Sequence, residues 1–196
     1  MSAPVLMTYR AAMTTLGLSS TLGVQNLEAA NYGRDRPVRD PDVVADLARR
    51  PYADEVALAR RVAPARILII QQGKHTRAPH DGRDGGWRSW LGADLSAPAA
   101  EQRLALCGWW DIAEPDQVAG MVGVVAGFVG VIGQVLPAQG RPGYRRAAGG
   151  RMRFALSTPD PVTDVGQVLL DLVGQRIVPR RGPLLFTLGQ SRNPQP

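Results

Sequence analysis

The sequence has one cysteine and one lysine, and it shows no export signal among its first residues. Cys107 stands alone among 196 residues, so no disulfide can form within the chain and no set of thiolates can hold zinc. The first twenty residues lack a basic segment followed by an apolar run, which is the pattern of a secretory signal. We therefore expect a protein of the reducing cytoplasm.

Acidic residues are scarce in the last sixty positions, where nine arginines accompany only three aspartates. The rest of the chain is nearly balanced, so this segment accounts for the net charge of +6. A local excess of positive charge favours an anionic partner such as nucleic acid. The alternative is that an arginine-rich, nearly lysine-free composition reflects coding bias and that the guanidinium groups only solvate a face.

No purely apolar run is long enough for a membrane helix. The apolar stretch of residues 118–133, bounded by Gln117 and Gln134, has sixteen residues without a charge, whereas a helix needs about 20 to span the hydrocarbon core. This run contains five glycines among branched side chains, a composition poor for a helix and good for strands. It predicts a hairpin with strands 118–125 and 128–136 around a turn at Ala126 and Gly127.

The remaining pattern alternates between short helices and short strands. Asp40 followed by Pro41 marks the start of a helix that ends before Pro51. Residues 1–39 show no sustained period and predict loops with at most a short helix, and residues 71–95 predict a long exposed loop. We expect further helices at 53–62, 97–106 with Ser96 as its cap, and 164–173, and further strands at 65–70, 151–157, 175–179 and 182–188.

These elements predict an α+β chain with three parts. Residues 1–64 form a helical and irregular extension, residues 65–190 a small β-rich domain with flanking helices, and residues 191–196 a disordered tail. A length of 196 residues fits one good core.

The order of elements resembles the PUA-like superfamily, which includes the PUA, ASCH, EVE and YTH domains, over residues 65–188. The residues that carry the resemblance are GWWDI (108–112), MVGVVAGFVGVIGQVLP (121–137), RMRF (151–154) and LVGQRIVPRRGPLLFTL (172–188). ASCH domains show a Gly-x-Lys-x-x-Glu motif, for which this chain offers Gly73 and Lys74 but has Arg77 in place of an acid. No enzymatic activity is therefore carried over from that branch.

The resemblance implies a pseudo-β-barrel whose cleft receives RNA, or a flipped or modified base of DNA. Trp109 and Trp110 are adjacent, so in a strand one fills the core and the other offers a stacking surface. Arginine side chains would contact phosphates. The candidate nucleic-acid-binding residues are Lys74, Trp109, Trp110, Arg145, Arg146, Arg151, Arg153, Arg176, Arg180 and Arg181. The alternative for the tryptophans is ordinary packing.

Other groups of residues give weaker evidence for a functional site. His75 and His80 with Asp81 and Asp84 fit no standard metal-binding spacing. Cys107 has no flanking signature of a nucleophile, and the glycines at 82–86 lack the rest of a P-loop. We expect no cofactor, no metal and no membrane association. Two other functions remain open: a protein-interaction subunit that binds through its N-terminal helices, and a small hydrolase that uses the histidine-containing loop.

Overall fold

The structure is a computed structural model and shows an α+β protein. It describes residues 5–33, 35–74, 76–77, 90–136, 143–147, 149–180 and 184–189. The helices in these ranges are α1 (Tyr9–Thr15), α2 (Thr21–Ala29), α3 (Pro41–Arg49), α4 (Glu55–Val62), α5 (Ala99–Leu106) and α6 (Asp164–Asp171), with a 3-10 turn at Pro115–Gln117. The strands are β1 (Arg66–Gln71), β2 (Thr76–Arg77), β3 (Trp90–Leu91), β4 (Val118–Val125), β5 (Phe128–Val135), β6 (Tyr144–Arg146), β7 (Met152–Phe154), β8 (Leu156–Ser157) and β9 (Leu185–Thr187).

Five of the strands form one mixed sheet in the order β8-β5-β4-β1-β9. β1 runs parallel to β4, and the other neighbouring pairs are antiparallel. β2 with β3 and β6 with β7 form separate two-stranded sheets. The predicted α+β class is therefore confirmed. Within the described ranges the sheet stays open, and its strands do not close into a barrel.

The charge-free centre of the chain folds into the predicted hairpin of β4 and β5. Its turn residues, Ala126 and Gly127, both have positive φ values, 51° and 86°, as a two-residue type I′ turn requires. A Cβ at position 127 would lie 2.8 Å from the carbonyl oxygen of Ile177, so the close approach also demands glycine. Among the described helices, none is long and apolar enough to cross a bilayer.

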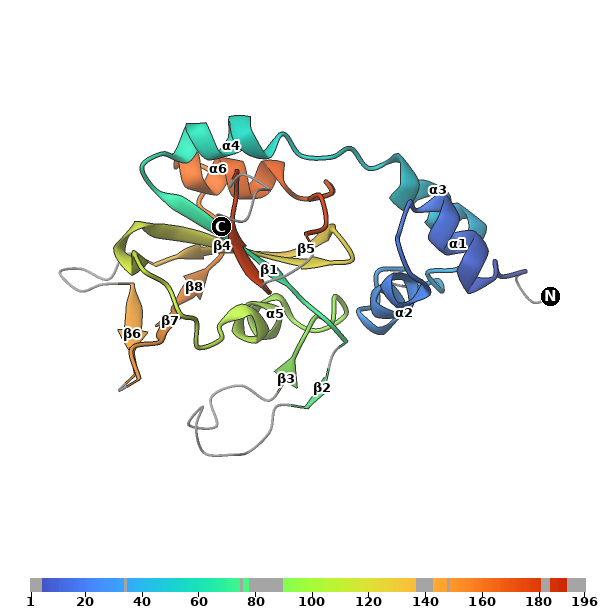
Figure 1. Ribbon diagram of the computed structural model, residues 1–196, viewed down its shortest axis with the longest axis horizontal. Coiled ribbons are helices and arrows are strands. Elements are labelled where there is room, and N and C mark those ends of the chain that lie inside the picture. The colour runs from blue at the N-terminus through green and yellow to red at the C-terminus, as the bar shows by residue number, and fades with distance from the viewer. Residues whose placement is uncertain are drawn as a thin grey trace, which may run out of the picture.

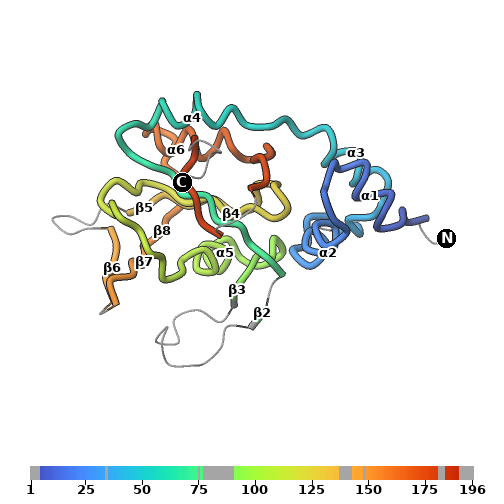
Figure 2. Tube along the Cα trace, in the orientation of Figure 1, coloured from blue at the N-terminus to red at the C-terminus, as the bar shows by residue number. Residues whose placement is uncertain are grey.

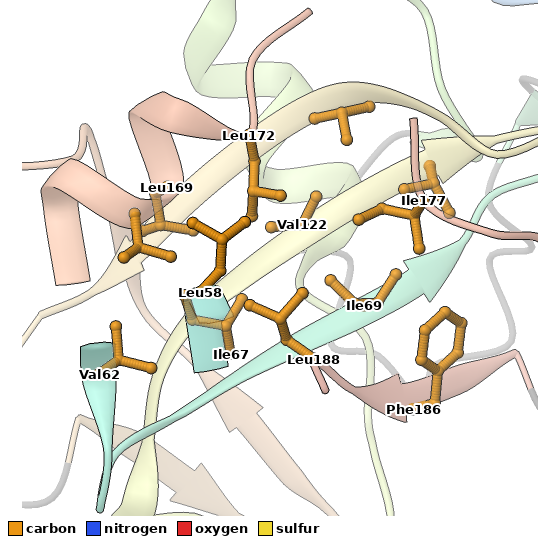
Figure 3. Packing of buried hydrophobic residues seen from close by; sticks show 13 residues of the cluster. Leu58, Val62, Ile67, Ile69, Val122, Leu169, Leu172, Ile177, Phe186 and Leu188 are labelled. Carbon is orange, nitrogen blue, oxygen red and sulfur yellow. The ribbon is translucent and has the colours of Figure 1, made fainter. Parts of the chain in front are cut away.

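Helices α4 and α6 cover one face of the sheet (Figure 1). Figure 3 shows Leu58 and Val62 of α4 and Leu169 of α6 converging on Ile67 and Ile69 of β1, all of them buried. Full burial of such a side chain contributes roughly 1.5–3 kcal/mol. The predicted boundary at residue 64 groups α4 with the N-terminal extension, whereas its apolar side packs with the sheet.

The opposite face of the sheet is covered by α5 and by the β6–β7 pair. Leu106 of α5 and Met152 and Phe154 of β7 are buried there against Leu68 and Ile70 of β1. This second core fixes β7 to the sheet through its alternate side chains.

Helices α1, α2 and α3 form a separate group at one end of the molecule (Figures 1 and 2). Their apolar side chains share a third core with Val125 and Phe128 at the tip of the central hairpin. The prediction of loops with at most one short helix for residues 1–39 is wrong, because this segment forms both α1 and α2. These helices have seven and nine residues, too few for an apolar period to repeat clearly.

Two local predictions also needed correction. α5 begins at Ala99 and not at 97, since the hydroxyl of Ser96 donates to Asp94 at 2.6 Å instead of capping the helix. Residues 175–179 form no strand: only Arg176 is bridged, to Tyr52 on one side and to Phe128 on the other.

Candidate nucleic-acid interface

The β6–β7 ribbon, residues 144–154, gathers several of the predicted site residues. Its antiparallel register pairs Tyr144 with Phe154, Arg145 with Arg153, and Arg146 with Met152. Residues that face each other across such a pair project to the same side, and successive residues alternate. The ribbon therefore has an inner and an outer face of different chemistry.

The inner face is anchored in the core. Met152 and Phe154 are buried, and the ring of Tyr144 packs against that of Phe154 with centroids 5.7 Å apart. The Tyr144 hydroxyl donates to the carboxylate of Asp116 at 3.1 Å. Because these contacts hold one side, only the outer face of the ribbon is available to a partner along this anchored stretch.

Trp109 and Trp110 lie beside strand β7 of the ribbon. Trp110 exchanges two backbone hydrogen bonds with Met152, of 2.8 and 2.7 Å, and its ring packs against the core. A Cβ at Gly108 would lie 2.7 Å from that ring, so only glycine leaves room for it. Alternation along a strand would place Trp109, one residue earlier, on the opposite side. The core contact of Trp110 agrees with the prediction that one ring packs inward, and the opposite orientation of Trp109 stays a prediction.

The outer face carries a row of one tryptophan and two arginines. The Trp110–Met152 register places Trp109 next to Arg153, whose guanidinium carbon lies over the indole, 5.7 Å from the centroid. Arg145 stands opposite Arg153 on the far side. Arg151, two residues before Arg153, is exposed on this face as well. We call this surface, Trp109 with Arg145, Arg151 and Arg153, the ribbon face.

The ribbon itself, residues 144–154, contains four arginines and no acidic residue. Arg145, Arg146 and Arg151 are exposed and form no ion pair within the part of the chain that the structure describes. Like charges that stand directly opposite in an antiparallel pair are destabilising. An anion between Arg145 and Arg153 would relieve this repulsion, and guanidinium groups match the oxygens of phosphate in geometry.

Among the described residues, the buried indole N–H groups of both tryptophans have no hydrogen-bond partner. A buried, unpaired donor costs roughly 1–3 kcal/mol, so the ring positions are set by packing and by Arg153 rather than by polar contacts. Trp109 itself is partly buried.

Several of the predicted residues lie off the ribbon face. Lys74 is exposed and bridges to Ala93 beside the β2–β3 pair, which Figure 1 shows apart from β6 and β7. Arg180 donates to Glu55 at 2.9 Å in a largely buried ion pair, and its guanidinium also lies over the ring of Phe186. Arg146 is paired with Met152 and therefore lies on the inner side of the ribbon, at its exposed end. Arg181 lies outside the described residues.

Arg176, another predicted contact residue, is buried with 6% of its surface exposed. Its guanidinium donates to the carbonyl oxygen of Leu16 at 2.7 Å, at the C-terminal end of α1, and lies 4.5 and 4.6 Å from the rings of Tyr52 and Phe128. The negative end of the helix dipole suits this cation. Arg176 therefore joins α1 to the hairpin and is no part of the ribbon face.

Sequence reasoning missed strand β6, because residues 137–150 contain Pro, Gly and Arg and predict only a loop. The available signal was symmetry about the turn. Arg145 and Arg153 are equally spaced from Gly149, as a hairpin around that position requires. Gly150, with a φ of 84°, completes the turn.

The structure adds no support for a nucleophile at Cys107 or for a metal site. Cys107 is buried, and its thiol donates to the carbonyl oxygen of Arg103 at 3.2 Å. His75, His80, Asp81 and Asp84 lie outside the described residues, and the described ranges hold no group of three His, Cys, Asp or Glu side chains that could bind a metal.

Comparison with known proteins gives no match. No family model, no curated protein and no solved structure matches the chain. The resemblance to the PUA-like superfamily stays a prediction.

Proposed function

We propose that the protein is a nucleic-acid-binding module and that the ribbon face is its contact surface. The observation that carries the proposal is the placement of Arg145 directly opposite Arg153, with Trp109 next to them on the same exposed side. Two facing cations favour an anion between them. A neighbouring indole adds a flat surface on which a base can stack.

Arginine and tryptophan would contribute different interactions to binding. Arginine forks donate paired hydrogen bonds to phosphate oxygens, which supplies affinity and orientation but no sequence information. Stacking on the indole contributes on the order of 1–3 kcal/mol and tolerates any base. We therefore expect binding that depends strongly on salt and weakly on sequence.

The finer fold assignment belongs to the same proposal. In a PUA-like domain the pseudo-barrel would present a cleft for RNA or for an extruded base of DNA. The β6–β7 ribbon, packed beside the open five-stranded sheet, would supply one wall of that cleft. The core contacts of Met152 and Phe154 support this placement of the ribbon against the sheet.

Fluorescence anisotropy with a fluorescein-labelled 12-nucleotide oligo(U) tests the proposal. The variant in which Arg145, Arg151 and Arg153 are all replaced by Ala should bind about tenfold more weakly or worse in 50 mM NaCl, because three phosphate contacts are lost. The matched control replaces Arg10, Arg49 and Arg60, three exposed helical arginines, by Ala and removes the same charge.

The control triple variant should bind within about twofold of the wild type if the contacts are local and not merely a net-charge effect. Equal losses in both triple variants contradict the proposed surface. Absence of any binding by the wild-type protein, to RNA or to DNA of the same length, contradicts the function itself.

A further inference from the structure

We infer that the turn end of the β6–β7 ribbon enters the major groove of double-stranded DNA. This inference rests on the proposed function and adds to it the form of the nucleic acid and the part of the ribbon that engages it. Three observations carry it: arginines on both sides of the ribbon near the turn, a turn of the smallest residues, and a neighbouring stretch of ribbon that is anchored in the core.

Arginines lie on both sides of the ribbon near its turn. Arg145 and Arg151 share the outer face on diagonal positions, where long side chains can reach a common ligand. Arg146 pairs with Met152 and lies on the opposite side. All three arginines are exposed, and none forms an ion pair with a residue that the structure describes. Beyond its anchored stretch, the ribbon therefore presents cations in two opposite directions.

The turn itself has no bulky side chain. Residues 147–150 are two alanines and two glycines. A Cβ at Gly149 or at Gly150 would have no atom within 4 Å beyond its chain neighbours, so both glycines border open space. Figures 1 and 2 show the turn end of β6 and β7 at the periphery of the molecule, pointing away from the five-stranded sheet. This end of the ribbon is therefore slim and accessible enough to enter a groove.

The major groove of B-form DNA fits this arrangement. The groove is about 12 Å wide, admits a two-stranded β-ribbon, and is bordered by a phosphate backbone on each side. With the turn in the groove, Arg145 and Arg151 face one backbone and Arg146 faces the other. A single strand has one row of phosphates and would leave Arg146 without a contact. The placement of cations on two sides therefore favours a duplex.

The shape of the groove also separates DNA from RNA. The major groove of an A-form RNA duplex is deep and narrow, and side chains do not read it. We therefore expect the ribbon end to prefer duplex DNA to duplex RNA. Alanine and glycine at the turn offer no side-chain donor or acceptor to the base edges, so binding should show little sequence preference.

The anchored stretch of the ribbon sets the direction of its turn end. Met152 and Phe154 are buried in the core, and the hydroxyl of Tyr144 donates to Asp116 at 3.1 Å. Tyr144 precedes Arg145 directly, and Met152 follows Arg151. The backbone that carries the arginines is therefore held in place before any ligand binds, which lowers the entropy cost of binding.

The experiment measures fluorescence anisotropy of the full chain with three fluorescein-labelled probes: a 12-base-pair DNA duplex, the RNA duplex of the same sequence, and 12-nucleotide oligo(U). The DNA duplex should bind about fivefold or more tightly than the RNA duplex in 50 mM NaCl, because only the B-form major groove admits the ribbon.

Arg146→Ala distinguishes contact on two sides from contact on one. It should weaken binding of the DNA duplex about threefold or more and make the slope of log K against log salt shallower by about 0.9, the contribution of one phosphate of B-DNA. Binding of oligo(U) should stay within about twofold of the wild type, since a single strand contacts only the outer face. Arg60→Ala removes an exposed arginine of α4 as the matched control and should leave both probes within about twofold.

Gly149→Leu tests entry of the turn into the groove. The fold has room for a side chain at this position, and circular dichroism checks that the variant is folded. The added bulk should weaken binding of the DNA duplex about fivefold or more and leave oligo(U) binding within about twofold, because the leucine would meet the floor of the groove. Gly149→Ala, with a single methyl group, should change duplex binding about twofold or less.

Each outcome has a distinct meaning. Duplex DNA that binds no more tightly than duplex RNA overturns this inference and leaves the proposed function standing. An Arg146→Ala variant that keeps its duplex affinity, or that loses oligo(U) and duplex affinity equally, does the same. Failure of all three probes to bind the wild-type protein overturns both. Losses in Arg146→Ala and Gly149→Leu that are confined to the DNA duplex support entry of the ribbon end into the groove.

Discussion

Arg145 and Arg153 are placed where two like charges repel, on facing positions of a short antiparallel pair. A protein without an anionic partner would be more stable with an acid at one of these positions. An anion bound between the two guanidinium groups would offset this repulsion. Arg146 has a different setting, because it faces the apolar side chain of Met152.

This difference leads to a prediction for Arg145→Glu. The new carboxylate would face Arg153 and raise the free energy of unfolding by about 0.2–1 kcal/mol, since opposite charges on facing positions attract. The same variant should weaken oligonucleotide binding, because a cation of the ribbon face becomes an anion. Urea unfolding and anisotropy measure the two effects.

Arg146→Glu is the matched control, with the same change of charge on the same strand. It should bring no gain in stability, because the residue across from it is Met152. If Arg145→Glu lowers stability and leaves binding intact, the two arginines do not face an anion site.

At the scale of elements, the turn between β4 and β5 is constrained by both its backbone conformation and its packing. Gly127 has a positive φ and lies against the carbonyl of Ile177 and the ring of Pro179. Gly127→Ala should therefore lower the free energy of unfolding by about 1–3 kcal/mol, through backbone strain and overpacking.

Gly149→Ala serves as its control, since a Cβ there would meet nothing within 4 Å and its φ is not positive. It should leave the melting temperature unchanged or slightly raised. Thermal unfolding followed by circular dichroism compares the stability of the two variants. Equal destabilisation would show that the turn geometry does not constrain position 127.

The elements that could be predicted from sequence are those with a strong local signal. Asp40 caps α3 by accepting from the amide of Asp42, and the glycine-rich hairpin has a turn that its composition favours. Strand β6 and helices α1 and α2 could not be predicted, because tertiary packing rather than local pattern fixes them. Tyr144 becomes strand by pairing with Phe154, and α1 and α2 gain stability from a shared core with Phe128.

The candidate site was predicted only in part, because local sequence signals identify residue types but not their burial. Composition identified Arg145, Arg151 and Arg153 as a basic segment, and adjacency separated Trp109 from Trp110. Composition could not separate exposed arginines from Arg176, whose burial depends on α1, a helix far away in the sequence. A charge count treats every arginine as available, whereas packing decides which ones are.

At the scale of the whole molecule, the helices α1–α3 and the ribbon face lie at opposite ends of the sheet (Figure 1). Polar contacts join the helices to the hairpin: Tyr32 donates to the carbonyl oxygen of Phe128 at 2.6 Å, and Arg176 to that of Leu16. Burial raises the pKa of the Tyr32 hydroxyl above its ordinary value, so it remains a neutral donor. The two ends can therefore be altered independently.

Arg176→Ala tests this separation. The substitution leaves the buried carbonyl of Leu16 unpaired and removes the cation between Tyr52 and Phe128, so the free energy of unfolding should fall by about 3 kcal/mol. Oligonucleotide affinity, measured at a temperature where the variant is folded, should stay within about twofold of wild type because the ribbon face is untouched. Loss of binding in a folded variant would place Arg176 in the interface.

The most direct test of the central claim, that nucleic acid binds on the ribbon face, is a nuclear magnetic resonance titration of the ¹⁵N-labelled protein with oligo(U), with the indole signals assigned through Trp109→Phe. The account predicts that the indole signal of Trp109 and the amide signals of Arg145, Arg151 and Arg153 shift together, while those of α1–α3 stay in place. Shifts confined to α1–α3, with the Trp109 signal unmoved at saturation, would contradict it.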